Sequence, residues 1–318
     1  MTTNIMTKSL LRSPKALQEL LQHDQFGAIA QKIEAVSEVH FIGTGSSNHA
    51  SLGAQAFLKP ILDIDVFVHR PTEHFVAKED AVLVFVSQTG TSLNVLQSLQ
   101  QFPNHLKIGV SQDPQAAIPL ACDFAVDLLI GEEPCNAKTV GVSTTFLSLV
   151  LLGLALTKQD QSKYVEMLSQ QVQQQETIIH EGFKQVETIN ANEYSHMFII
   201  TSPELRSVGE EAALKYLEVA LQPAVFCDVD EFSHGFNRMI TKQSLILYIS
   251  SEQSSFDDAL QQFVQETKAS LLKLQPATGV LAGLGFVHAI IAKIADQMDI
   301  DPNLPLYDWF NEAVKTRI

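Results

Sequence analysis

Residues 211–235, with the sequence EAALKYLEVALQPAVFCDVDEFSHG, combine side chains that could move a proton. Lys215 and Glu218 lie three positions apart on a predicted helix, and His234 follows in a polar turn. The predicted buried side of this helix consists of Leu214, Leu217, Val219, Ala220 and Leu221. Such neighbours would desolvate Glu218 and raise the pKa of its carboxyl toward the range of a general base. The alternative is that Glu218 only pairs with Lys215 at helical spacing.

Two further loops are rich in small and hydroxyl-bearing residues. The sequence GTGSSNHA covers residues 43–50, and SQTGTS covers residues 87–92. In the second loop Gly90 allows the backbone N–H groups to turn inward at a predicted helix start. Hydroxyl groups come from Ser87, Thr89, Thr91 and Ser92. A phosphate dianion would fit such a loop, although serine and threonine also cap helices without any ligand. Gln88 could bond a sugar hydroxyl or a neighbouring loop.

Other site classes are not indicated. The first loop has Asn48 where a dinucleotide fingerprint needs its third glycine, and neither loop contains a P-loop lysine. The histidines show no metal-binding spacing, so we expect neither a metal nor another cofactor. His49 is expected to cap or pack, and His288 is expected in the core because an apolar stripe surrounds it.

The hydroxyl-rich loops follow predicted strands. In the first half of the chain, short β-branched runs alternate with helical stretches, which predicts a parallel sheet with strands over 39–43, 66–69, 81–87, 106–110 and 124–127. Both loops then lie at the carboxyl ends of strands, where open α/β sheets bind their ligands.

The same pattern restarts in the second half. A long polar helix is predicted over 159–190, followed by strands over 197–201, 224–227, 245–250 and 270–274. We therefore predict an N-terminal domain over 1–158, a connecting helix over 159–190 and a C-terminal domain over 191–318.

Composition sets the remaining limits. The 318 residues are 46% hydrophobic with a formal net charge of −15, and basic residues do not cluster, which disfavours nucleic acid and membrane partners. The three cysteines lack pairing or zinc spacing. No leader pattern or membrane-length apolar run is apparent, with residues 140–156 the nearest, so a cytoplasmic protein is expected.

The combination of GTGSSNHA, SQTGTS and EAALKYLE with EFSHG resembles the sugar isomerase (SIS) family. It is most similar to the tandem branch that includes the isomerase half of glucosamine-6-phosphate synthase and the fructosamine-6-phosphate deglycases. The resemblance covers roughly residues 41–318. It implies two SIS-type subdomains, each a parallel sheet flanked by helices in a flavodoxin-like three-layer α/β/α arrangement, and a homodimer with a shared active site.

The resemblance also implies roles for individual residues. Glu218 would be the base that moves a proton between carbons 1 and 2, Lys215 would assist it, and His234 would open or close the sugar ring. The sugar phosphate would be held by residues Gly45, Ser46, Ser47, Ser87, Gln88, Thr89 and Ser92. Lys138 and Ser143 are alternatives for one further pocket position.

Three departures from the family pattern limit the transfer. Only about forty residues precede the first strand, so a glutaminase domain and glutamine-dependent amide transfer are not expected. The motif proline after the His-Gly pair is Phe236. Lys315 is the candidate for the C-terminal substrate lysine, but a one-residue gap would move that position onto Val314 or Glu312.

We therefore expect an enzyme that transfers a proton on an open-chain sugar or amino-sugar 6-phosphate. An aldose–ketose or amino-sugar isomerase and a fructosamine-6-phosphate deglycase share their first half-reaction, so the residues do not separate them. The competing class is a regulator that binds a sugar phosphate without catalysis.

Overall fold

The structure is a computed structural model that describes residues 4–34, 36–157 and 160–304. Within these residues the chain forms two compact units, each built around one parallel sheet. Among the described residues, the first-sheet unit consists mainly of residues 15–134 and 140–169, and the second-sheet unit of residues 4–14, 135–139 and 170–303. The second-sheet unit thus includes residues 4–14 and 135–139, which are separated in sequence from its main stretch.

The first sheet has five parallel strands in the order β2-β1-β3-β4-β5. Its strands are β1 (Glu38–Gly43), β2 (Asp65–His69), β3 (Val82–Val86), β4 (Leu106–Ser111) and β5 (Phe124–Asp127). All residues of β1 and β3 are buried, as in a sheet covered on both faces. The chain reverses its direction of winding between β1 and β3, so the carboxyl ends of these two strands form the switch point of this sheet.

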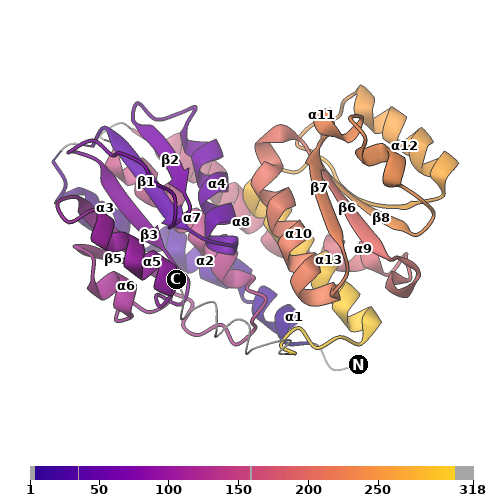
Figure 1. Ribbon diagram of the computed structural model, residues 1–318, viewed down its shortest axis with the longest axis horizontal. Helices are drawn as coiled ribbons and strands as arrows, with labels where there is room; N and C mark the ends of the chain where they lie inside the picture. The colour runs from indigo at the N-terminus through magenta and orange to yellow at the C-terminus, as the bar shows by residue number, and fades with distance from the viewer. Residues whose placement is uncertain (1–3, 35, 158–159, 305–318) are drawn as a thin grey trace. The chain divides into compact units, whose positions relative to one another are not determined.

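Helices cover both faces of the first sheet (Figure 1). On one face α4 packs against β1, β2 and α7, while α3 packs against α7 and β5. On the other, a cluster around Phe85, Val95 and Ile118 joins the sheet to α5 and α6. The helices of this unit are α2 (Ser13–Gln22), α3 (Gln25–Ala30), α4 (Ser46–Leu58), α5 (Leu93–Ser98), α6 (Ala117–Leu120), α7 (Val140–Leu156) and most of α8 (Ser162–Gln173).

The second sheet repeats this strand order with four parallel strands, β7-β6-β8-β9. Its strands are β6 (His196–Thr201), β7 (Ala224–Asp228), β8 (Ser244–Ile249) and β9 (Ser270–Leu274). Every strand predicted from the sequence is present, and the predicted fold of two parallel sheets flanked by helices is confirmed.

Two groups of helices enclose the second sheet (Figure 1). On one face α10 packs against β6, β7 and α13, and α13 packs against α9 and α1. On the other face Phe232, Phe256 and Phe263 form edge-to-face ring contacts over the strands. The helices of this unit are α1 (Ile5–Leu10), α9 (Gln175–Val186), α10 (Arg206–Ala220), α11 (Val229–Phe232), α12 (Ser255–Thr267) and α13 (Val280–Met298).

The prediction of a single connecting helix over 159–190 is wrong, because the structure has two helices there, α8 and α9. They meet at Gln174, whose Oε1 accepts a hydrogen bond from Thr278 Oγ1 at 2.9 Å. α9 packs closely on α13, and a side chain at Gly182 would bring its Cβ within 2.8 Å of Ala289 Cβ. Packing on α13 therefore ties α9 to the second sheet.

The expectation that no apolar run reaches membrane-spanning length is also wrong. Helix α13 has 19 residues with a mean hydropathy of 1.4, which suffices by length and composition alone. However, 83% of this stretch is buried inside the fold, as expected for the core helix of a folded unit.

Candidate active site

The two hydroxyl-rich loops lie at the switch point of the first sheet. Gly43 at the end of β1 pairs with Val86 at the end of β3. A Cβ at Gly43 would lie 3.1 Å from Ser47 Cβ and 3.2 Å from the Val86 carbonyl oxygen. Ser47 therefore lies close to the carboxyl ends of β1 and β3. Sheets with this strand order bind ligands at this point. The structure thus brings together the loops that contain Ser47 and Ser87.

The loop after β3 presents paired hydroxyl groups. Ser87 Oγ lies 2.8 Å from Ser92 Oγ, and Thr89 Oγ1 lies 3.0 Å from Thr91 Oγ1. In each pair one hydroxyl donates its hydrogen to the other. The accepting hydroxyl can then donate its own hydrogen to another acceptor. Gly90 has a φ of +68°, in the region that favours glycine, and a Cβ at this position would lie only 2.4 Å from Ala116 Cβ. The loop therefore holds its hydroxyl donors in a fixed arrangement.

The loop after β1 leads directly into a helix. Gly45 has a φ of +56° and precedes α4, which begins at Ser46. Ser46 and Ser47 are both half-buried. The first-turn N–H groups of a helix have no intrahelical acceptors, so Ser47 adds a backbone donor to the switch point.

Hydrogen bonds connect Gln88, in the loop after β3, to Glu133 and Gly141. Gln88 Nε2 donates to Glu133 Oε2 at 2.8 Å, and the same oxygen accepts from the backbone N–H of Gly141 at 3.1 Å. Glu133 is only 2% exposed. Ser143, two residues further along α7, is buried, and its hydroxyl has no hydrogen-bond partner among the described residues. Ser143 thus belongs to the same unit as the loop over residues 87–92, whereas Lys138 is half-buried and grouped with the second-sheet unit.

The corresponding switch point of the second sheet is already filled by a carboxylate. Ser202 follows β6 and Ser251 follows β8, and both hydroxyls donate to Glu204 Oε1, the first at 2.5 Å. Burial opposes the charge of Glu204, but these hydrogen bonds outweigh it and lower the pKa of this carboxyl. By contrast, no carboxylate accepts from Ser87, Thr89 or Ser92 within the described chain. Only the first sheet therefore keeps its loop hydroxyls available to an anion.

Helix α10 carries Lys215 and Glu218, two of the predicted catalytic residues. Lys215 Nζ lies 2.6 Å from Glu218 Oε2 and 3.4 Å from Glu211 Oε1. The side chains of Lys215 and Glu211 are 2% and 0% exposed, whereas that of Glu218 is 40% exposed. The expectation that Glu218 is desolvated by apolar neighbours is therefore wrong for this chain, because Glu211 occupies the buried position. Leu217 and Leu221, expected on the buried side, are each 48% exposed.

Lys215 is a cation in this setting. Burial opposes its charge, but the carboxylates of Glu211 and Glu218 outweigh burial and raise the pKa of the Lys215 ammonium above its ordinary value. His288 Nε2, from α13, lies 3.5 Å from Glu211 Oε1 in the same buried cluster. A protonated Lys215 cannot accept a proton, so its contribution is to hold the Glu218 carboxylate and to supply positive charge.

His234 lies in a turn after α11, as predicted, and is exposed. Its backbone N–H donates to the Glu231 carbonyl at 2.9 Å. Gly235 has a φ of +117°, a conformation that favours glycine, so the His-Gly pair fits this turn. Phe236 packs against the core of the second sheet. No hydrogen bond or ion pair joins His234 to Glu218 within the described residues. The predicted residue Lys315 lies outside the described residues.

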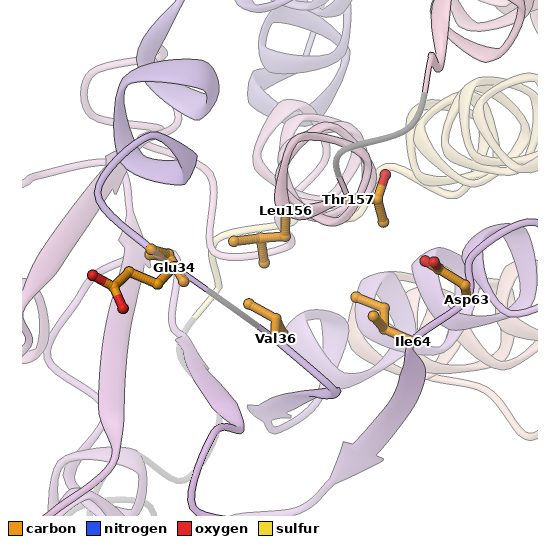
Figure 2. Close-up of a pocket in the computed structure, with 7 residues that line it drawn as sticks. Glu34, Val36, Asp63, Ile64, Leu156 and Thr157 are labelled. Atoms are coloured by element: carbon orange, nitrogen blue, oxygen red, sulfur yellow. The ribbon is translucent and has the colours of Figure 1, made fainter.

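A separate hollow of about 260 Å³ lies at the opposite end of the first sheet (Figure 2). Val36 and Ile64 precede β1 and β2, so they mark the amino ends of these strands, and Leu156 ends α7. In Figure 2 the Glu34 carboxylate points away from these apolar side chains. The hollow shares no residue with the predicted site.

Comparison with known proteins identifies the fold. No protein-family model matches the chain. The structure superposes on a proposed phosphosugar isomerase from Clostridium difficile 630 with a TM-score of 0.86 and 21% identity, covering 97% of both chains. It also superposes on the C-terminal domain of glucosamine-fructose-6-phosphate aminotransferase from Francisella tularensis, with a TM-score of 0.81, 16% identity and coverage of 96% and 99%. The chain has the tandem SIS fold.

Sequence relatives agree with this SIS fold. Glutamine–fructose-6-phosphate aminotransferase of Chlamydia caviae is 26% identical over 273 residues, which cover 76% of this chain and 43% of that protein. The human aminotransferase 2 is 26% identical over 249 residues, covering 70% and 35%. The chain spans less than half the length of these relatives. The resemblance to the tandem SIS family is confirmed.

Two buried carboxylates were not among the predicted site residues. Glu211 lies four residues before Lys215, and this i, i+4 spacing on a helix is a signal that could have indicated the pair. Glu133 follows β5 in a loop, and nothing in its local sequence indicates that it bonds Gln88, forty-five residues earlier.

Proposed function

We propose that this chain is a phosphosugar enzyme of the SIS type, acting on an open-chain sugar or amino-sugar 6-phosphate. The observation that carries the proposal is the pair of hydroxyl-rich loops at the β1–β3 switch point, in contrast to the Glu204-filled switch point of the second sheet. The names of the similar proteins support the substrate class, since they include fructose-6-phosphate aminotransferases and a glucosamine-6-phosphate deaminase from Thermotoga maritima, with a TM-score of 0.77.

The proposed chemistry is proton transfer between carbons 1 and 2. In an isomerase, Glu218 removes a proton next to the carbonyl, and the resulting enediol is reprotonated on the adjacent carbon. In a deglycase, the same base moves a proton from carbon 1 to carbon 2 of an amine-bearing fructose 6-phosphate. The aldimine that results is hydrolysed by water to glucose 6-phosphate and the free amine. Lys215 supplies a cation beside Glu218, and His234 is proposed to open or close the sugar ring.

A substrate panel tests this function. Hexose 6-phosphates, glucosamine 6-phosphate and fructosamine 6-phosphates should be incubated with the protein, and both the isomer and the free amine should be followed. Formation of an isomer alone indicates an isomerase, and release of amine with glucose 6-phosphate indicates a deglycase. Absence of both products for every compound would contradict an enzyme of this class.

The phosphate loop gives a prediction about affinity. Replacing Ser87 and Thr89 by alanine removes a hydroxyl from each of the two pairs, so binding of sugar phosphates should weaken by tenfold or more, at about 1.5–3 kcal/mol for a hydrogen bond to a charged group. Binding of the matching neutral sugars should change little. Calorimetric titration of both ligand types checks this, with Ser254→Ala, a helix cap in the other unit, as the control. Equal losses for both ligand types would remove the phosphate assignment.

A homodimer with a shared active site is also proposed, from the resemblance to the SIS branch. If each site takes Glu218 from one subunit and His234 from its partner, mixing a Glu218→Gln subunit with a His234→Ala subunit should restore activity in the mixed dimer. Each variant should be inactive as a homodimer. Verified mixed dimers that stay inactive would place both groups on one subunit or deny one of them a catalytic role.

One observation favours a second candidate, a binding protein without catalysis. Glu218 is half-exposed and already paired with Lys215, and one similar structure is a proposed sugar-binding protein from Salmonella typhimurium with a TM-score of 0.76. In that case sugar phosphates would bind but remain unchanged in the panel above.

A further inference from the structure

The side-chain amide of Gln88 already uses both of its N–H groups. Nε2 donates to Glu133 Oε2 at 2.8 Å and to Gln112 Oε1 at 3.2 Å. A glutamine amide has two donors on nitrogen and an acceptor on oxygen. The acceptor, Oε1, makes no hydrogen bond within the described residues, and the side chain is half-buried. What Gln88 can offer a ligand through its side chain is therefore an acceptor.

Glu133 fixes this orientation. An ionised carboxylate can only accept hydrogen bonds, so rotating the amide would set Oε1 against Glu133 Oε2 in a buried position. Glu133 itself is anchored by the backbone N–H of Gly141 at 3.1 Å. The amide also lies against the first turn of α7, since a Cβ at Gly141 would come within 2.0 Å of Gln88 Cδ. Neither Gln88 nor Glu133 can turn without disturbing the other.

A phosphate group cannot use the free position. At neutral pH its peripheral oxygens act mainly as acceptors, and two acceptors placed face to face repel each other. The hydroxyl groups of a sugar, or the N–H groups of an amino sugar, are donors and match Oε1. The arrangement therefore separates Gln88 from its neighbours Ser87, Thr89 and Ser92, which can donate to phosphate.

We infer that Gln88 selects the sugar part of the substrate, accepting a hydrogen bond from one hydroxyl or amine through Oε1, and that Glu133 is the positioning residue that sets this polarity. The inference rests on the proposed function. It also selects between two expectations from the sequence, in which Gln88 either bonds a sugar hydroxyl or belongs to the residues that hold the phosphate.

Binding measurements with three kinds of probe test it. Inorganic phosphate reports on the phosphate loop, glucose 6-phosphate and fructose 6-phosphate report on the whole site, and their deoxy derivatives report on single hydroxyls. In Gln88→Met the sugar phosphates should bind about 2- to 13-fold more weakly, the range for one lost neutral hydrogen bond, while the affinity for phosphate stays that of the wild type. In the wild type, one deoxy derivative should bind more weakly than its parent sugar phosphate by a similar factor. In Gln88→Met, the same derivative and its parent should bind equally tightly.

Glu133→Gln tests the positioning role, because the new amide can donate to Gln88 and allow its amide to reverse. This variant should lose discrimination between the parent sugar phosphate and that same deoxy derivative, and it should keep its affinity for phosphate. Gln100→Met, at an exposed position in the same unit, is the matched control, and thermal unfolding of each variant verifies its fold.

The outcomes separate this inference from the proposed function. Gln88 does not contact the sugar if Gln88→Met weakens the binding of phosphate as much as that of the sugar phosphates. The same holds if every deoxy derivative loses as much affinity in Gln88→Met as in the wild type. In both cases the proposed function stands. If Glu133→Gln keeps the full discrimination, Glu133 does not set the polarity. If the wild type binds phosphate but no sugar phosphate, the proposed function fails, and this inference fails with it.

Discussion

Glu218→Gln is expected to lower turnover by about 10²- to 10⁴-fold, the usual effect of removing a general base, while affinity for the sugar phosphate changes little. The amide keeps the size and one acceptor of the carboxylate, so contact with Lys215 can persist while the proton acceptor is lost. Steady-state kinetics and direct binding measurements together separate the two effects.

Glu210→Gln provides the control on the same helix. Glu210 pairs with Arg206 at 2.9 Å, so it is also a carboxylate in an ion pair on α10, but it is not proposed to contact substrate. Its replacement should leave turnover near that of the wild type. If Glu218→Gln behaves like Glu210→Gln, the pair of Lys215 and Glu218 is structural, and another group must act as the base.

Lys215→Met is expected to destabilise the protein by about 3–5 kcal/mol, because it removes the cation that lies 3.4 Å from the buried Glu211 carboxylate. His288 Nε2 lies 3.5 Å from Glu211 Oε1, farther than the Lys215 ammonium at 3.4 Å. Chemical denaturation monitored by circular dichroism measures the loss.

The double variant Glu211→Gln/Lys215→Met distinguishes an unpaired charge from a simple loss of packing. Removing both charges should recover a large part of the stability, since a buried pair replaced as a unit costs far less than one broken on a single side. If the double variant is at least as unstable as the sum of the two single variants, the cluster does not act as a coupled ion pair.

The inner strands β1, β3, β6 and β8 were predictable from the sequence because they are buried on both faces. β3, with the sequence VLVFV, is a continuous apolar run that ends at a small-residue loop. The break between α8 and α9 was not predictable, since the sequence is evenly polar around Gln174. The break depends on packing of α9 against α13, far along the chain.

The candidate site shows the same limit. The hydroxyl loops were predictable because they contain residues with local meaning, such as Gly90 and Ser87. On α10, however, apolar residues occur around the whole helix, so the sequence does not reveal that Leu217 faces solvent and Lys215 faces the core. That choice is made by the elements that α10 packs against, β6, β7 and α13. Long-range packing likewise brings Glu133 to Gln88.

The fate of the carbon 1 hydrogens tests the central claim most directly. Fructose 6-phosphate and a fructosamine 6-phosphate, each dideuterated at carbon 1, should be incubated with the protein and followed by nuclear magnetic resonance. Proton transfer by Glu218 predicts that one of these substrates loses deuterium from carbon 1, to carbon 2 or to solvent, and that Glu218→Gln nearly abolishes this loss. Binding of both sugar phosphates with full retention of deuterium at carbon 1 would contradict the account.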